Sequence, residues 1–286
     1  MILCAGVLLA LIIGWGLVSA RRMLTPLQRA YPVPNPLPPV TTIPLVSHDG
    51  AAFDAWLFDT PAPRGFLLAC HGYHGNRIQL LALSDALRNR GYAVMTLDLR
   101  GHGDRPGWCT FGVRDRQDLD AMLRWRGLQP ALALLPVGML GWSLGGAIAC
   151  QVAAQQPLVK ALALDSTFSR LFPIAARVVN VRYHLPVIPF AWITWAGVQL
   201  ALGRTLSTLD PLRLAPKLRV PLLWIHGQQD QTVAVQQGEE LYAAWPGPKE
   251  RWSDPRAGHV GTFELEPHDY VNRVAGFFDR CLAAGR

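Results

Sequence analysis

Ser143 stands between glycines directly after an apolar run, an arrangement that can turn its hydroxyl into a nucleophile. The apolar run covers residues 137–140, the pattern GWSLG covers residues 141–145, and a stretch rich in alanine and other apolar residues follows. A chain that turns at once from strand to helix strains the residue at the apex, and only small side chains fit two positions before and after it. We therefore predict that Ser143 occupies a nucleophile elbow between a buried strand and a buried helix.

A serine hydroxyl attacks a carbonyl efficiently only when a base accepts its proton and a third group orients that base. Asp230 follows the apolar run 222–225 within the segment HGQQDQTV, and His259 lies in the glycine-flanked loop AGHVG near the C-terminus. A loop of this kind can hold an imidazole without helical constraint. We predict that Asp230 is the acid and His259 the base.

Two other residues compete for these roles. Asp165 also follows an apolar run, although a buried aspartate there can equally hydrogen-bond the following turn. His268 is the only other histidine downstream of Asp230, and its setting, EPHDY, is typical of the capped start of a final helix. Both residues remain alternatives at this stage.

Acyl transfer also requires hydrogen-bond donors for the developing oxyanion, each worth about 3 kcal/mol in a well-studied protease. The segment HGYHGN at residues 71–76 directly follows the apolar run 66–70 and contains two glycines. We predict an oxyanion hole formed by the backbone N–H groups of Tyr73 and of Leu144, the residue after the nucleophile. The alternative is a glycine turn without a catalytic role.

The elements that must position these residues are apolar runs that alternate with helix-length segments. The predicted strands are residues 66–70, 93–97, 137–140, 161–164 and 222–225. Short, almost entirely apolar strands of this kind are typical of a parallel sheet covered by helices on both faces, with ligands beyond the carboxyl ends of the strands. Two earlier runs flank the turn SHDG and predict an opening hairpin, at residues 41–46 and 53–58. The fold class is therefore α/β, with a mostly parallel central sheet.

A helical insertion at about residues 167–209 interrupts the alternation of strands and helices. It contains a charge-free run, residues 185–203, that carries three large aromatic residues. We favour a cap that presents an apolar wall to the substrate. A second membrane span and a helix facing the core are the alternatives, and two prolines at the start of the run weaken the span.

The N-terminal segment carries the pattern of a membrane anchor. Residues 2–20 contain no charge over 19 positions, long enough for a helix to cross a bilayer. Arg21, Arg22 and Arg29 follow, which by the positive-inside rule leaves the C-terminal side in the cytoplasm. A cleaved export signal is the alternative, because small residues at 18–20 resemble a cleavage site, although a basic start is missing. We expect a single-pass protein of the cell membrane whose catalytic domain lies in the cytoplasm.

Three segments follow from these signals. We predict an anchor at residues 1–22, a linker at residues 23–40 and an α/β domain with its cap at residues 41–286. Six prolines in the linker predict an extended, semi-rigid spacer.

Composition excludes several classes of function. The five cysteines are scattered and mostly lie in apolar runs, so neither a disulfide framework nor a metal site is predicted. Of the five, we expect Cys109, in a polar loop, to be the exposed one. The net charge of +7 comes almost wholly from arginine, and we favour a solvated, arginine-rich surface. For an anchored protein, attraction to anionic lipid headgroups is the alternative. Without a basic helix or zinc spacing, the charge does not predict nucleic-acid binding. The sequence gives no indication of oligomeric state.

These motifs together resemble the α/β-hydrolase superfamily, and within it the bacterial serine aminopeptidase-like and Bem46-like hydrolases. The resemblance covers roughly residues 41–282 and rests on HGYHGN, DLRGHG at residues 98–103, GWSLGG and HGQQDQTV. It implies an α/β-hydrolase fold, the chain order serine, acid, histidine, and hydrolysis through an acyl-enzyme without a metal or organic cofactor. One departure is Asp104, which stands where such chains often carry a serine after DxRGxG and bears on the geometry of that loop.

The expected function is that of a membrane-anchored serine hydrolase acting on an ester, thioester or amide. The apolar cap and the anchor favour a hydrophobic, lipid-like acyl substrate, whereas the scaffold itself serves esterases, lipases, thioesterases, peptidases and lyases. Two other functions stay open: a non-catalytic binding module at the membrane, and cofactor-free lyase or haloperoxidase-type chemistry on the same triad.

Overall fold

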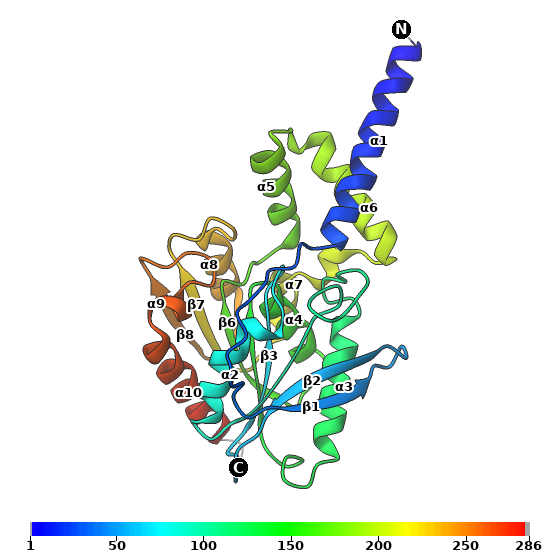
Figure 1. Ribbon diagram of the computed structural model, residues 1–286. Helices are drawn as coiled ribbons and strands as arrows, with labels where there is room; N and C mark the ends of the chain where they lie inside the picture. Colours follow the sequence, from blue (N-terminus) through cyan, green and yellow to red (C-terminus); the bar gives the residue numbers. More distant parts are fainter. Residues whose placement is uncertain (1, 284–286) are drawn as a thin grey trace.

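Eight strands form one mostly parallel sheet in the computed structural model, which describes residues 2–283 (Figure 1). Their order is β1-β2-β4-β3-β5-β6-β7-β8. The strands are β1 (Thr41–Val46), β2 (Ala52–Phe58), β3 (Phe66–Cys70), β4 (Ala93–Leu97), β5 (Val137–Trp142), β6 (Val159–Asp165), β7 (Leu222–Gly227) and β8 (Lys249–Asp254). The antiparallel pair β1 and β2 is the predicted hairpin, and β3 to β8 run parallel. The predicted α/β-hydrolase fold class is confirmed.

Helices cover both faces of the sheet, which explains why its central strands are apolar along their whole length. In chain order the helices are α1 (Ile2–Leu24), α2 (Leu81–Arg88), α3 (Asp115–Gly127), α4 (Leu144–Ala153), α5 (Leu171–Tyr183), α6 (Trp192–Leu202), α7 (Pro211–Leu214), α8 (Val235–Ala244), α9 (Thr262–Leu265) and α10 (Pro267–Ala283), of which α1, α5 and α6 project away from the sheet (Figure 1). Leu67 and Ala69 of β3 join the core formed with α2 and α10, whereas Phe66, Leu68 and Cys70 join the core formed with α3, α4 and α8. Successive side chains of a strand alternate between faces, so both faces need apolar residues.

Strand β8 was missed by the sequence analysis. Its sequence, KERWSD, is mostly charged or polar, because it is the edge strand of the sheet and most of its side chains are at least partly accessible to solvent. An edge strand shows neither the apolar run nor the strict alternation on which the prediction of strands depends.

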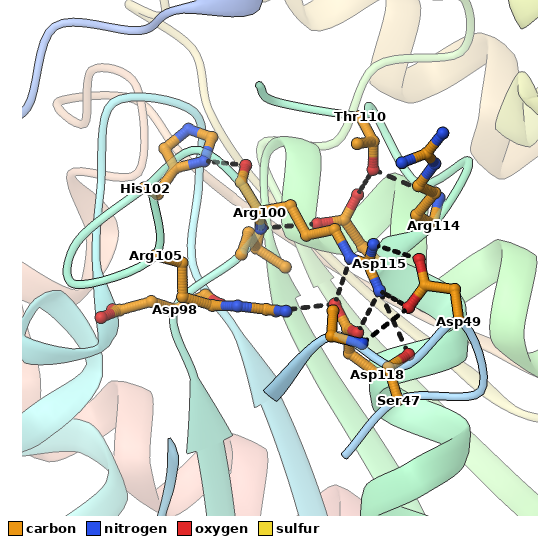
Figure 2. Close-up of polar contacts among 12 residues, drawn as sticks. Ser47, Asp49, Asp98, Arg100, His102, Arg105, Thr110, Arg114, Asp115 and Asp118 are labelled. Atoms are coloured by element: carbon orange, nitrogen blue, oxygen red, sulfur yellow. Dashed lines mark hydrogen bonds and ion pairs between the residues drawn. The ribbon is translucent and has the colours of Figure 1, made fainter. Parts of the chain in front are cut away.

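A buried ion network fixes the loop between β4 and α3 (Figure 2). Asp118 accepts hydrogen bonds from the guanidinium groups of Arg100, at 2.7 and 2.9 Å, and Arg105, at 2.6 Å. Arg100 also donates to Asp49, in the turn between β1 and β2, at 2.6 and 2.9 Å. The backbone N–H of Arg100 donates to Asp115 at 2.9 Å. The network ties the hairpin, the loop and α3 together.

The insertion between β6 and β7 forms two helices, α5 and α6, joined by the short π-helical turn η2 (Val187–Ala191). It projects from the sheet in the same direction as α1, and α6 lies beside the C-terminal half of α1 (Figure 1). Within residues 2–283, one helix is long and apolar enough to cross a membrane, at Gly6–Leu24. The charge-free run 185–203 does not form a second helix of that length, because the backbone at Ile188 is extended (φ −101°, ψ 126°) and α6 has only 11 residues.

The chain after α1 lies against the α/β domain. The side chain of Gln28 donates to the Gly101 carbonyl at 2.8 Å and accepts from the Gly103 N–H at 2.8 Å. The N–H of Cys109 donates to the Leu24 carbonyl at 2.7 Å, and its side chain is buried. The expectation that Cys109 is exposed was therefore wrong, because the segment that covers this loop is distant in the sequence.

Candidate active site

Ser143 lies at the turn from β5 into α4 with a strained backbone (φ 53°, ψ −114°). This left-handed region is costly for a residue with a β-carbon. The Ser143 N–H donates to the Asp165 carbonyl at 2.8 Å, which fixes the turn against β6. A β-carbon at Gly145 would lie 2.2 Å from the Cys70 carbonyl oxygen, and one at Gly141 would lie 2.5 Å from the Gly145 backbone. The strained apex with obligatory flanking glycines is as the spacing predicts.

The structure brings Asp230 and His259 together. Oδ2 of Asp230 lies 2.7 Å from Nδ1 of His259, and Oδ1 accepts the backbone N–H groups of Thr232 and Val233, each at 2.8 Å. The carboxylate is fully buried, whereas the imidazole is 26% exposed. A carboxylate held by two backbone donors can orient the imidazole, so that Nδ1 carries the proton and Nε2 is free to accept one.

Asp230 is held in its ionised form. Burial raises the pKa of this carboxyl, but the hydrogen bond and charge of His259 and the two backbone N–H groups outweigh burial and lower the pKa below its ordinary value. A negative carboxylate at this point stabilises the imidazolium that forms when a base takes up a proton.

Neighbouring strand ends bring the histidine loop to the serine. Ser143 follows β5, Asp230 follows β7 and His259 follows β8, with β6 between the serine and the acid. The N–H of Val260 donates to the Ser166 hydroxyl at 3.0 Å, and Ser166 directly follows the residue whose carbonyl binds the Ser143 N–H. No hydrogen bond joins the Ser143 hydroxyl to His259 among the residues that the structure describes. Such bonds are often long before substrate binds and shorten in the Michaelis complex.

The rival residues have other partners. Asp165 accepts hydrogen bonds from the hydroxyls of Ser166 and Tyr270, each at 3.0 Å, and burial raises its pKa to about 7. His268 lies in the first turn of α10, exposed, with Nδ1 3.1 Å from the Asn272 amide. The structure therefore pairs His259 with Asp230 and gives Asp165 a different hydrogen-bond network.

The predicted oxyanion donors flank Ser143. Leu144 is the first residue of α4, where a backbone N–H has no intrahelical acceptor. The Tyr73 N–H makes no hydrogen bond within residues 2–283. A β-carbon on Gly72 would lie 3.4 Å from the Ser143 β-carbon, so the loop that carries Tyr73 passes directly over the serine.

His71 holds this loop in place, a role the sequence analysis did not assign. Its Nε2 accepts the Leu99 N–H at 3.0 Å, so Nδ1 carries the proton and donates to the Gly72 carbonyl at 2.8 Å. Burial lowers the pKa of His71 to about 3, which keeps the ring neutral. In the sequence, the only indication of this role was that His71 directly follows an apolar strand.

A small cavity adjoins the start of α4. It is lined mainly by apolar side chains of α4, of the loop before α3 and of the insertion, namely Phe111, Leu144, Ala147, Phe168, Leu171, Leu206 and Leu209, together with Gln151 and Asp210. Within the described part of the chain, no three His, Cys, Asp or Glu side chains are grouped so that they could hold a metal ion. The cavity has a volume of only about 10 Å³, room for about one water molecule, so it shows an apolar lining beside Leu144 and not an open acyl-binding site.

Comparisons with known proteins agree with the fold. Residues 61–196 match the family model described as serine aminopeptidase, S33. The chain is 28% identical over 274 residues to the uncharacterized protein Rv2307c of Mycobacterium tuberculosis (strain H37Rv), covering 94% of this chain and 90% of that protein. It is 35% identical over 102 residues to a pimeloyl-[acyl-carrier protein] methyl ester esterase of Neisseria meningitidis, covering 35% and 36% of the two chains. The structure of the Pyrococcus furiosus esterase Pf2001 is similar, with a TM-score of 0.73 at 22% identity over 91% of this chain and 99% of that one.

Proposed function

Since the chain belongs to the α/β-hydrolase superfamily and has a serine-hydrolase-type fold, we propose that it is a membrane-anchored enzyme that cleaves an ester, thioester or amide through Ser143, Asp230 and His259. The observation that carries this proposal is the 2.7 Å contact between the buried Asp230 carboxylate and His259, in the loop next to the strained Ser143 turn.

The proposed reaction runs through an acyl-enzyme. The Ser143 hydroxyl attacks the substrate carbonyl while Nε2 of His259 takes its proton and then delivers it to the leaving group. Asp230 stabilises the imidazolium, and the N–H groups of Tyr73 and Leu144 donate to the oxyanion. Water activated by His259 then releases the acyl group and restores the serine.

We assign α1 to the membrane as a retained anchor. An export signal cleaved after Ala20 would remove the helix that packs on α6, including the hydrogen bond between Ser19 and Thr194, at 2.6 Å. Those contacts favour retention. The arginines directly after the apolar stretch favour a cytoplasmic catalytic domain.

The substrate we propose is a hydrophobic acyl compound. The cavity next to Leu144 is lined mainly by apolar side chains, several of them from the insertion at residues 167–209, which acts as a cap in this proposal. The partial relative from N. meningitidis is named a pimeloyl-[acyl-carrier protein] methyl ester esterase, and an acyl substrate agrees with that name. The cavity has room for about one water molecule, so binding an acyl chain requires the insertion to move away from α4.

Labelling with a fluorophosphonate probe tests the nucleophile. We expect the full chain in detergent to be labelled, Ser143→Ala to lose labelling, and the control Ser253→Ala, on β8, to keep it. A wild-type chain that stays unlabelled would favour the binding-module alternative. A series of p-nitrophenyl esters then tests the substrate class, and a preference for short, water-soluble esters or aminoacyl amides over long acyl chains would contradict it.

A further inference from the structure

The C-terminal half of α1 packs closely on α6 through small residues. A β-carbon on Gly16 would lie 2.1 Å from the Ile193 side chain, and one on Gly197 would lie 3.0 Å from the Ala20 β-carbon. The hydroxyls of Ser19 and Thr194 are 2.6 Å apart and buried between the helices. Small residues at a close crossing, with a hydroxyl pair between the helices, are typical of helices that associate within a membrane.

The length of α1 constrains where α6 can lie. The stretch that is apolar enough to cross a bilayer is Gly6–Leu24, 19 residues, which rise about 28 Å and so match a hydrocarbon core of about 30 Å. The contacts with α6 begin near Gly16, and the ten residues from 6 to 15 rise only about 15 Å. If α1 spans the bilayer, α6 must therefore enter the near leaflet beside it.

The outer surface of the insertion is apolar, as a lipid-facing surface must be. Ile188 in the turn between the helices is 73% exposed and Leu200 on α6 is 83% exposed. Val178 and Val181 of α5 and Trp192 of α6 are also exposed. Trp15 of α1 contacts both Tyr183 of α5 and Phe190 of the turn edge to face, which adds aromatic contacts between α1 and the insertion.

The excess positive charge of the protein is confined to these two segments. Residues 1–48 and 167–209 contain seven arginines and no lysine, aspartate or glutamate. The net charge of these two segments is therefore +7, the same as that of the whole chain. Arg170 pairs with Glu240 of α8, whereas Arg21, Arg177 and Arg204 are exposed around the apolar surface. Exposed arginines next to an apolar face attract anionic headgroups.

We propose that the insertion enters the near leaflet of a bilayer that contains anionic lipid, with α6 against α1, so that a lipid-borne acyl chain reaches Ser143 from the membrane. This inference rests on the proposed anchor and deepens it, because it makes the bilayer the partner of the insertion as well as of α1. The residues that would meet lipid first are those of the turn between α5 and α6.

Depth-dependent quenching in vesicles tests the proposal. The full chain, with Cys4 and Cys281 replaced by alanine, receives one cysteine at Ile188 or at Leu134, which is 96% exposed in the loop before β5, at the opposite end of that strand from Ser143. In a third protein, Cys4 is kept as the probe of α1, Cys281 is replaced by alanine, and no cysteine is introduced. Each is labelled with an environment-sensitive fluorophore and reconstituted in phosphatidylglycerol and phosphatidylcholine vesicles with nitroxide-bearing acyl chains.

We expect strong quenching at Ile188 and Cys4, at least threefold above that at Leu134. If Cys4 is quenched but Ile188 is quenched no more than Leu134, the inference about the insertion is overturned and the anchor stands. Absence of quenching at both Cys4 and Ile188 would overturn the anchor as well. Fluorophosphonate labelling of each variant checks that it is folded, and in vesicles without phosphatidylglycerol we expect weaker quenching at Ile188.

Discussion

The phenolic hydroxyl of Tyr73 donates a 2.8 Å hydrogen bond to the Met23 carbonyl, in the last turn of α1. Tyr73 is also the residue whose backbone N–H is the proposed oxyanion donor. His74, the next residue, has Nδ1 2.9 Å from the Leu27 carbonyl. The loop over Ser143 is therefore bound directly to the end of α1, so the position of α1 bears on the geometry of the proposed oxyanion hole.

Replacing Tyr73 with phenylalanine removes this bond and keeps the backbone donor. Because a hydrogen bond contributes about 1 kcal/mol net, we expect kcat/KM for a soluble ester to fall about fivefold. Tyr242→Phe on α8 is the control, since the Tyr242 hydroxyl makes no hydrogen bond to another described residue. Equal activity of the two variants would show that the contact with Met23 does not support catalysis.

Asp230→Asn separates the two candidate acids. The amide cannot stabilise an imidazolium and favours the wrong imidazole tautomer, so we expect kcat to fall about 10⁴-fold. The matched variant Asp165→Asn, at the end of the neighbouring strand β6, should keep most of its activity because Asp165 binds Tyr270 and Ser166. The reverse ranking of the two variants in an ester hydrolysis assay would reassign the acid to Asp165.

Asp165 should make stability depend on pH. Burial raises its pKa to about 7 from 3.8, while the hydrogen bonds from Ser166 and Tyr270 act in the opposite direction. The folded protein then binds this proton more tightly than the unfolded chain, so the free energy of unfolding falls as pH rises from about 4 to about 7. Thermal unfolding in detergent at pH 5 and pH 8 should show a smaller loss for Asp165→Asn than for the wild type. Parallel changes in the two proteins would rule out this titration.

Removing Asp118 should destabilise the fold. Its carboxylate is fully buried and pairs with both Arg100 and Arg105 (Figure 2). Asp118→Ala leaves these guanidinium groups without that partner, which costs about 3 to 5 kcal/mol for a buried pair. Asp269→Ala, which breaks the half-exposed pair with Arg273, is the control and should leave the unfolding midpoint unchanged. Similar midpoints for the two variants, measured by chemical denaturation, would contradict a structural role for the network.

The sequence by itself determined the features that follow from local sterics and periodicity. The glycines around Ser143 are required because a β-carbon at Gly141 or Gly145 would collide with backbone atoms, and this constraint is readable from spacing alone. Strands such as β3 and β4 were recognisable because burial on both faces requires apolar residues throughout. Asp230 could be selected because it follows a predicted strand, and His259 because it lies in a glycine-flanked loop. Both come after Ser143 in the order serine, acid, histidine that is typical of the superfamily.

Only the tertiary structure decided the features that depend on atoms far apart in the chain. Two aspartates follow neighbouring strands, and what distinguishes them is that Asp230 meets His259 whereas Asp165 meets Tyr270. The edge position of β8, the burial of Cys109 beneath Leu24 and the packing of α1 on α6 likewise join segments distant in sequence. The energy of a carboxylate, a thiol or an apolar face depends on its neighbours in space, and a one-dimensional pattern does not specify those neighbours.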